Sequence, residues 1–165
     1  MNLSHADLAK LAASGIPPEL AAQAQLRRVD SREGGAIVGR NGSRDYSGIV
    51  IPYFRPGHDG AMTHRLRLDH PETEYKDGKL REKNKYLSPP GEGNKLYFVP
   101  GTVPEWLLDS TLPVVITEGE KKTLSLWELA HYGLSDAVEL PIPSDWPFRR
   151  MEFSVNDWQD RRPGW

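Results

Sequence analysis

Apolar positions near the N-terminus recur with the spacing of two short helices. Ser4, followed by Asp7 three residues later, resembles a capping box, and apolar residues then recur at helical spacing up to Ala12. Two consecutive prolines open a second helix, predicted over residues 19–28, whose apolar side chains can pack against the first. The pattern therefore predicts an N-terminal helical pair.

The period changes to two, the spacing of β-strands, in the middle of the chain. An apolar strand that begins at Tyr46 is expected to end near Pro52, and turn residues follow it. Residues 62–69 then alternate polar and apolar side chains, which predicts the second strand of a hairpin. This hairpin places three charged side chains on one face: Arg65, Arg67 and Asp69.

The segments on either side of this hairpin have turn and loop composition. Residues 31–48 are rich in Gly, Arg and Ser and are predicted as a loop or irregular hairpin, with a tight turn at Asn41-Gly42. After Asp69 we expect a polar loop of mixed charge, and residues 96–99 then predict one more short strand.

A short apolar run over residues 114–117 stops at Glu118, and a helical pattern begins within three residues. This predicts a buried strand, a tight turn and a helix that ends near residues 131–133. The turn lies at the carboxyl end of the strand, where ligands of α/β sheets bind, so Glu118 is the leading candidate site residue. The alternative is a plain turn with a carboxylate near a helix N-terminus, which the helix dipole favours.

The run Thr117-Glu118-Gly119-Glu120, between an apolar strand and a helix, resembles the first motif of the Toprim domain of bacterial primases, topoisomerases and related nucleases. The resemblance implies that Glu118 works beside Mg²⁺ as a general acid/base or metal ligand, with Glu120 as a helper. Lys122 stands where many primases have an acid. The Glu-Gly-Glu-Lys-Lys form is similar to an uncharacterised group of Toprim-containing, primase-like proteins of phages, plasmids and integrated elements.

Residues 46–101 are similar to the subdomain that precedes Toprim in bacterial replicative primases, with the same order of strands, turn and Lys-Tyr-Leu motif. This resemblance implies that Arg65 and Arg67 lie in a basic template groove and that Lys85 contacts nucleotides. From the residues alone, two alternatives stay open. The Arg pair can be a solvated strand face with Asp69 as partner, and Lys85 can belong to a mixed-charge loop.

The second acidic motif of the Toprim family, Asp-x-Asp, has no match, because Asp157 and Asp160 have a different spacing. The resemblance therefore implies an α+β chain that is truncated within its Toprim-like α/β unit. The expected organisation is an N-terminal helical segment, a primase-core-like subdomain with a small, mostly antiparallel sheet, a partial Toprim-like β-α unit, and a tail rich in Pro and Trp that can bind a partner: residues 1–30, 31–104, 105–140 and 141–165.

Composition narrows these expectations further. The net charge is -2, but residues 27–67 hold eight Arg against four acids, a local balance of +4 that permits nucleic-acid contact. The chain has no cysteine, which excludes disulfides and a cysteine-based zinc ribbon. No apolar run reaches the roughly 18 residues of a membrane span, so we expect a cytoplasmic protein without membrane contact.

Two functions are compatible with these patterns. The first, implied by the resemblance, is a primase-like protein of a mobile element that acts in DNA replication on single-stranded DNA or nucleotides. Its partner would be a replication helicase or a longer replication protein. The second is a non-catalytic module that binds nucleic acid or a replication complex. Lys121 and Lys122 at the helix start oppose a metal ion and favour a phosphate, so we expect the isolated chain to bind Mg²⁺ poorly and to be inactive.

Overall fold

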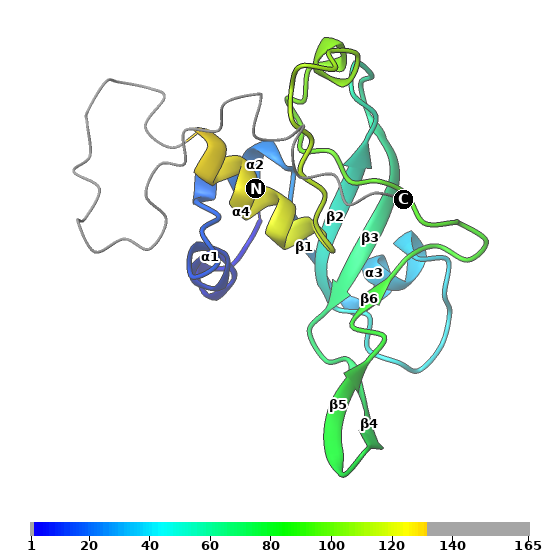
Figure 1. Ribbon diagram of the computed structural model, residues 1–165. Coiled ribbons are helices and arrows are strands. Elements are labelled where there is room, and N and C mark those ends of the chain that lie inside the picture. Colours follow the sequence, from blue (N-terminus) through cyan, green and yellow to red (C-terminus); the bar gives the residue numbers. More distant parts are fainter. Residues whose placement is uncertain (1, 132–165) are drawn as a thin grey trace, which may run out of the picture. The chain divides into compact units, whose positions relative to one another are not determined.

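A four-stranded antiparallel sheet with the order β1-β2-β3-β6 is the centre of the structure (Figure 1). The computed structural model describes residues 2–131. The four strands are β1 (Arg27–Val29), β2 (Gly48–Phe54), β3 (Ala61–Leu68) and β6 (Tyr86–Leu87). The predicted α+β class with an antiparallel sheet is confirmed.

Strands β2 and β3 form the predicted hairpin, in which Ile51 is paired with Arg65 and Ile49 with Arg67. Leu66 is buried, whereas Arg65 and Arg67 are half-buried, as the period of two requires. Strand β2 continues past Pro52 to Phe54. A proline is tolerated there because β1 pairs only with residues 48–50, so no strand on that side needs the missing N–H group.

Three helices cover one face of the sheet: α1 (His5–Ala12), α2 (Pro18–Gln23) and α4 (Glu120–His131). The predicted capping box is present, because Ser4 Oγ accepts from the Asp7 N–H and the Asp7 carboxylate accepts from the Ser4 N–H. The helices and β2 share one hydrophobic core, to which α4 contributes Leu124. The N-terminal helices and α4 are thus parts of the same packing unit.

The opposite face of the sheet is covered by α3 (Ser31–Ile37), in a segment that we predicted as a loop. That prediction, which rests on the Gly, Arg and Ser content of residues 31–48, is wrong, and two of these glycines, Gly34 and Gly35, lie within the helix. A Cβ atom at Gly34 would lie 2.0 Å from the carbonyl oxygen of Tyr46, so this helix position needs glycine for close packing. Asp30 caps the helix by accepting from the Glu33 N–H.

The second N-terminal helix ends earlier than predicted, because α2 stops at Gln23 and residues 27–29 form β1. Gln25 has a φ of 53°, a left-handed conformation that no helix interior contains. The chain turns there and pairs with β2, so that Arg28 lies opposite Ile49. Backbone pairing with a distant strand thus outweighs a helical pattern of only a few residues.

The predicted polar loop after Asp69 is instead a β-hairpin of β4 (Glu72–Lys76) and β5 (Lys79–Lys83). Its turn, Asp77-Gly78, has positive φ at both positions, as the favoured two-residue hairpin turns require. Every residue of both strands is exposed, and Figure 1 shows the hairpin extending away from the four-stranded sheet. The strand predicted over residues 96–99 is not formed, although Val99 is buried in the core.

The helix predicted after Glu118 is confirmed as α4, but the buried strand predicted before it is wrong. Residues 113–117 are irregular, and Val114, Val115 and Ile116 are 72 to 80% exposed. No strand within residues 2–131 is paired with this run, and its apolar side chains are exposed. A short 3₁₀ helix, η1 (Pro104–Leu107), precedes it.

Several predictions fall on residues 132–165, which lie outside the described part of the chain. They are the end of the partial Toprim-like unit, the Pro- and Trp-rich tail, and the placement of Asp157 and Asp160. Within residues 2–131, no helix is both long enough and apolar enough to cross a membrane.

Candidate nucleic-acid interface

Glu120, the first residue of α4, is buried and faces the β2–β3 hairpin. Its side chain is 4% exposed, and its Oε1 atom accepts hydrogen bonds from the Tyr53 hydroxyl and, over 2.9 Å, from Arg65 Nη1. Burial and the hydrogen bond to Glu120 raise the pKa of Tyr53 to about 12, so the hydroxyl stays protonated and donates at neutral pH. A buried carboxylate needs such partners, because an unpaired one is costly.

Three cations from different elements come together beside this carboxylate. Lys10 of α1, Arg67 of β3 and Lys121 of α4 line one pocket, and Lys85 lies near enough that its charge acts on Lys121. Partial burial lowers the pKa of Lys121, and the positive charges of Arg67 and Lys85 lower it further. We call Lys10, Arg67, Lys85 and Lys121 the cationic cluster.

Most of the cationic cluster is not neutralised by acids. Within residues 2–131, Lys10, Arg67 and Lys121 form no ion pair, whereas Lys85 pairs with Glu82 at 2.6 Å. The two acids that line the same pocket are already engaged, Asp7 with Arg28 and Glu120 with Arg65. The pocket therefore has a surplus of positive charge.

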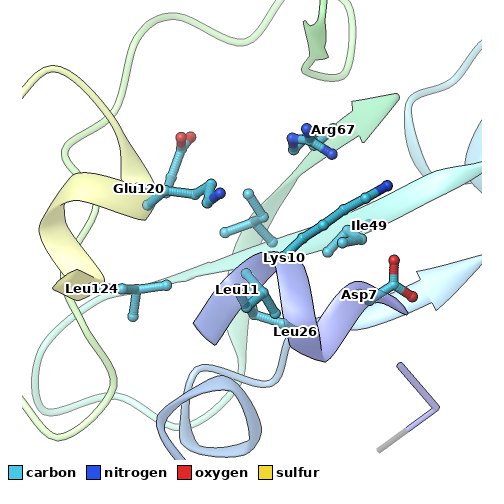
Figure 2. A pocket seen from close by; sticks show the side chains of 10 residues that line it. Asp7, Lys10, Leu11, Leu26, Ile49, Arg67, Glu120 and Leu124 are labelled. Atoms are coloured by element: carbon cyan, nitrogen blue, oxygen red, sulfur yellow. The ribbon is translucent and has the colours of Figure 1, made fainter. Parts of the chain in front are cut away.

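The pocket itself has a volume of about 30 Å³, the share of a single water molecule in the liquid. Figure 2 shows its apolar floor, with Leu11 and Leu124 from two helices, and the charged side chains of Lys10, Arg67 and Glu120 around it. A small molecule does not fit into this space. The arrangement suits an anion, such as a chain phosphate, that lies across the charged rim.

Glu118, the predicted catalytic residue, lies at the surface just before α4. Its side chain is 79% exposed and pairs with Lys122 across one turn at 2.5 Å. The hydrogen bond from Lys122 lowers the pKa of Glu118. Glu118 and Lys122 are thus paired with each other at the surface, whereas the buried Glu120 side chain binds Tyr53 and Arg65.

Within residues 2–131, the acids predicted to bind Mg²⁺ do not form a metal site with each other. Within the described residues, no group of three or more His, Asp or Glu side chains is placed to hold a metal ion. Mg²⁺ is usually held by one or two carboxylates that remain free to coordinate it. Glu120 is instead bound to Tyr53 and Arg65, and this leaves the exposed Glu118, beside Lys122, as the one accessible acid of the predicted pair.

Half of the eight Arg in residues 27–67 form ion pairs within the described part of the chain. Arg27 pairs with Glu33, Arg44 with Glu72 and Arg65 with Glu120. Asp69, the expected partner of the Arg pair, binds Arg28, which also binds Asp7. Arg65 and Arg67 share a strand face as predicted, but only Arg67 joins the cationic cluster.

Lys10 is the member of the cationic cluster that sequence reasoning missed. It lies in α1, 57 positions before Arg67, in a helix whose pattern indicates only packing. No local signal connects the two residues, because they meet only when α1 packs on the sheet.

Comparison of the chain with models of known protein families, with curated proteins and with solved structures finds no match.

Proposed function

We propose that this protein binds single-stranded nucleic acid through its phosphate backbone, as a non-catalytic module. The observation that carries the proposal is the convergence of Lys10, Arg67 and Lys121 on one pocket rim without an ion pair among residues 2–131. Phosphate contacts of this kind supply most of the affinity of sequence-independent binding.

Positive charges held close together repel each other and raise the free energy of the folded protein. A bound phosphate offsets this repulsion. The lowered pKa of Lys121 indicates this repulsion, because part of it comes from the charges of Arg67 and Lys85. Arg67 offers a planar fork of donors that matches phosphate oxygens, and the lysines act as mobile point charges. Lys10, Arg67 and Lys121 come from three elements, so the pocket rim exists only in the folded protein.

The motif resemblance supports a role for this binding in the replication of a phage, plasmid or integrated element, beside a helicase or a longer replication protein. A primase-like catalytic role is the second candidate. The exposed carboxylate of Glu118 favours it, since this side chain is accessible to a substrate. The inward bonds of Glu120 favour the binding module, because they remove the helper acid that a metal site would need.

The test is binding of a fluorescent single-stranded oligonucleotide, followed by anisotropy at several salt concentrations. Lys10→Ala, Arg67→Ala and Lys121→Ala should each weaken binding and make the slope of log affinity against log salt shallower by about 0.7, the share of one phosphate on a single strand. Lys122→Ala is the matched control, because it removes a neighbouring helix lysine that pairs with Glu118. Absence of salt-sensitive binding at protein concentrations on the order of 50 μM would refute the proposal.

A further inference from the structure

A second, larger cavity lies between β3 and the loop that follows β6. Its volume is about 160 Å³, and its lining includes Thr63, Arg65, Ser88, Asn94 and Lys95. None of these residues belongs to the cationic cluster. This is well above the roughly 10–15 Å³ that one water needs, so the cavity has room for a small anion.

Two polar atoms in the lining residues are buried without a partner. Within the described residues, neither Thr63 Oγ1 nor Arg65 Nε has a hydrogen bond. A buried polar atom without a partner is costly, and a ligand that reached these two atoms would remove that cost. Arg65 is also held in place by its Nη1 bond to Glu120, which leaves the Nε edge of its guanidinium group preorganised.

The loop opposite Arg65 lets a ligand approach the backbone. Gly91 has a φ of +80°, which favours glycine, and a Cβ atom built at Gly93 would meet nothing within 4 Å. The backbone around Gly93 is therefore unobstructed where it lines the cavity. Backbone N–H groups that are free of other contacts can donate to the oxygens of an anion.

The charges around the cavity are those of Arg65, Lys95 and Glu92. Burial lowers the pKa of His64, and the charge of Arg27 lowers it further, so this lining residue adds no positive charge at neutral pH. Two carboxylates oppose an anion here: Glu92, which pairs with Lys95, and Glu120, which pairs with Arg65. A dianion that binds Lys95 must displace Glu92, whose side chain lies on an exposed loop.

We propose that this cavity binds a phosphomonoester group, held by Arg65, Lys95, the hydroxyls of Thr63 and Ser88, and the backbone at Gly93. The group can be free phosphate, a nucleoside 5′-phosphate or the 5′-phosphate of a strand. The site does not depend on the proposed nucleic-acid function, because it shares no residue with the cationic cluster.

The experiment is a titration of the full ¹⁵N-labelled chain, followed by NMR, with inorganic phosphate and with uridine 5′-monophosphate at constant ionic strength set by chloride. Saturable shifts of the Gly93 and Asn94 amide signals are expected. Lys95→Ala should weaken binding about tenfold, as for the loss of a hydrogen bond to a charged group. Glu92→Gln should tighten binding severalfold, because it frees Lys95.

Lys79→Ala, an exposed lysine of the β4–β5 hairpin, is the control and should leave the affinity unchanged. If uridine 5′-monophosphate binds more tightly than inorganic phosphate, the ligand is a phosphate group attached to a sugar. If the two bind equally, the site recognises the phosphate alone. Oligonucleotides with and without a 5′-phosphate distinguish a strand end. Arg67→Ala should not alter these amide shifts, even if it abolishes binding of the strand. Shifts that chloride reproduces, or a Glu92→Gln variant that binds more weakly, would overturn the proposal.

Discussion

Arg65 and Glu120 join β3 to the start of α4 across 55 positions of sequence, through a hydrogen bond of 2.9 Å between Arg65 Nη1 and Glu120 Oε1. The sequence predicts ligand contacts for both residues, a nucleic acid for Arg65 and a metal ion for Glu120. Their pairing gives both a structural role, because it stabilises the α4 helix start against the sheet.

Glu120→Ala should therefore destabilise the protein. The substitution leaves Arg65 and the Tyr53 hydroxyl without their partner, and breaking a buried pair of this kind costs about 3 kcal/mol. Urea unfolding followed by tryptophan fluorescence measures the change. Glu118→Ala is the control, since its exposed side chain pairs only with Lys122 and its loss should leave the midpoint unchanged. Equal stability of the two variants would contradict this role for Glu120.

The ion pair of Asp7 with Arg28 should make stability depend on pH in the acid range. The hydrogen bond from Arg28 lowers the pKa of Asp7, against the opposing effect of burial, and the bonds from Ser4 lower it further. The folded pKa is below the unfolded value of about 3.9, so the stabilisation is complete above that pH and is lost as the pH falls through the folded pKa.

Urea midpoints of the wild type and of Asp7→Asn, measured between about pH 2.5 and 7, test this. The wild type should lose stability below about pH 4 by more than the variant does. Parallel curves for the two proteins would show that Asp7 is not the group responsible.

The lowered pKa of Lys121 predicts a pH dependence of nucleic-acid binding. Only the protonated lysine attracts phosphate, so affinity should be constant below the lowered pKa and should fall as the pH rises through it. Lys121→Arg keeps its charge at every accessible pH and should flatten this decline. Anisotropy titrations between about pH 7 and 10 would reveal the difference, and identical profiles would argue against a phosphate contact by Lys121.

The packing of α3 on the sheet predicts that Gly34→Ala is disruptive. The new Cβ would lie 2.0 Å from the Tyr46 carbonyl oxygen, so the backbone must shift, at a cost of about 1–3 kcal/mol. Gly42→Ala is the matched control, because the nearest atom to its new Cβ is 3.8 Å away. Thermal unfolding should separate the two variants, and a Gly34→Ala protein with the control's Tm would refute the close contact.

The isolated chain should neither synthesise primers nor cut DNA with Mg²⁺ or Mn²⁺. A metal ion needs free carboxylate oxygens, and of the two candidate acids Glu120 is bound to Arg65, while Glu118 stands beside the positive charge of Lys122. Primer synthesis and nuclease assays with the wild type and Glu118→Gln in parallel provide the measurement. Metal-dependent activity that disappears in Glu118→Gln would establish a catalytic role for this carboxylate and contradict the binding-module proposal.

The sequence by itself determined the features that depend on neighbours along the chain. The capping box of Ser4 and Asp7, the alternation along β3 and the helix α4 arise from contacts within a few residues, so local patterns predict them. The shared face of Arg65 and Arg67 follows from the strand period in the same way.

Only the tertiary structure decided which of these residues form ion pairs within the protein and which remain available to a ligand. Arg65 is taken up by Glu120 while Arg67 joins Lys10 and Lys121, because α1 and α4 pack on one face of the sheet. In helix α3, Gly34 allows Tyr46 to approach closely, and residues 114–117 are irregular and paired with no described strand. Such contacts join residues far apart in the chain, and their energies have no signature in local sequence patterns.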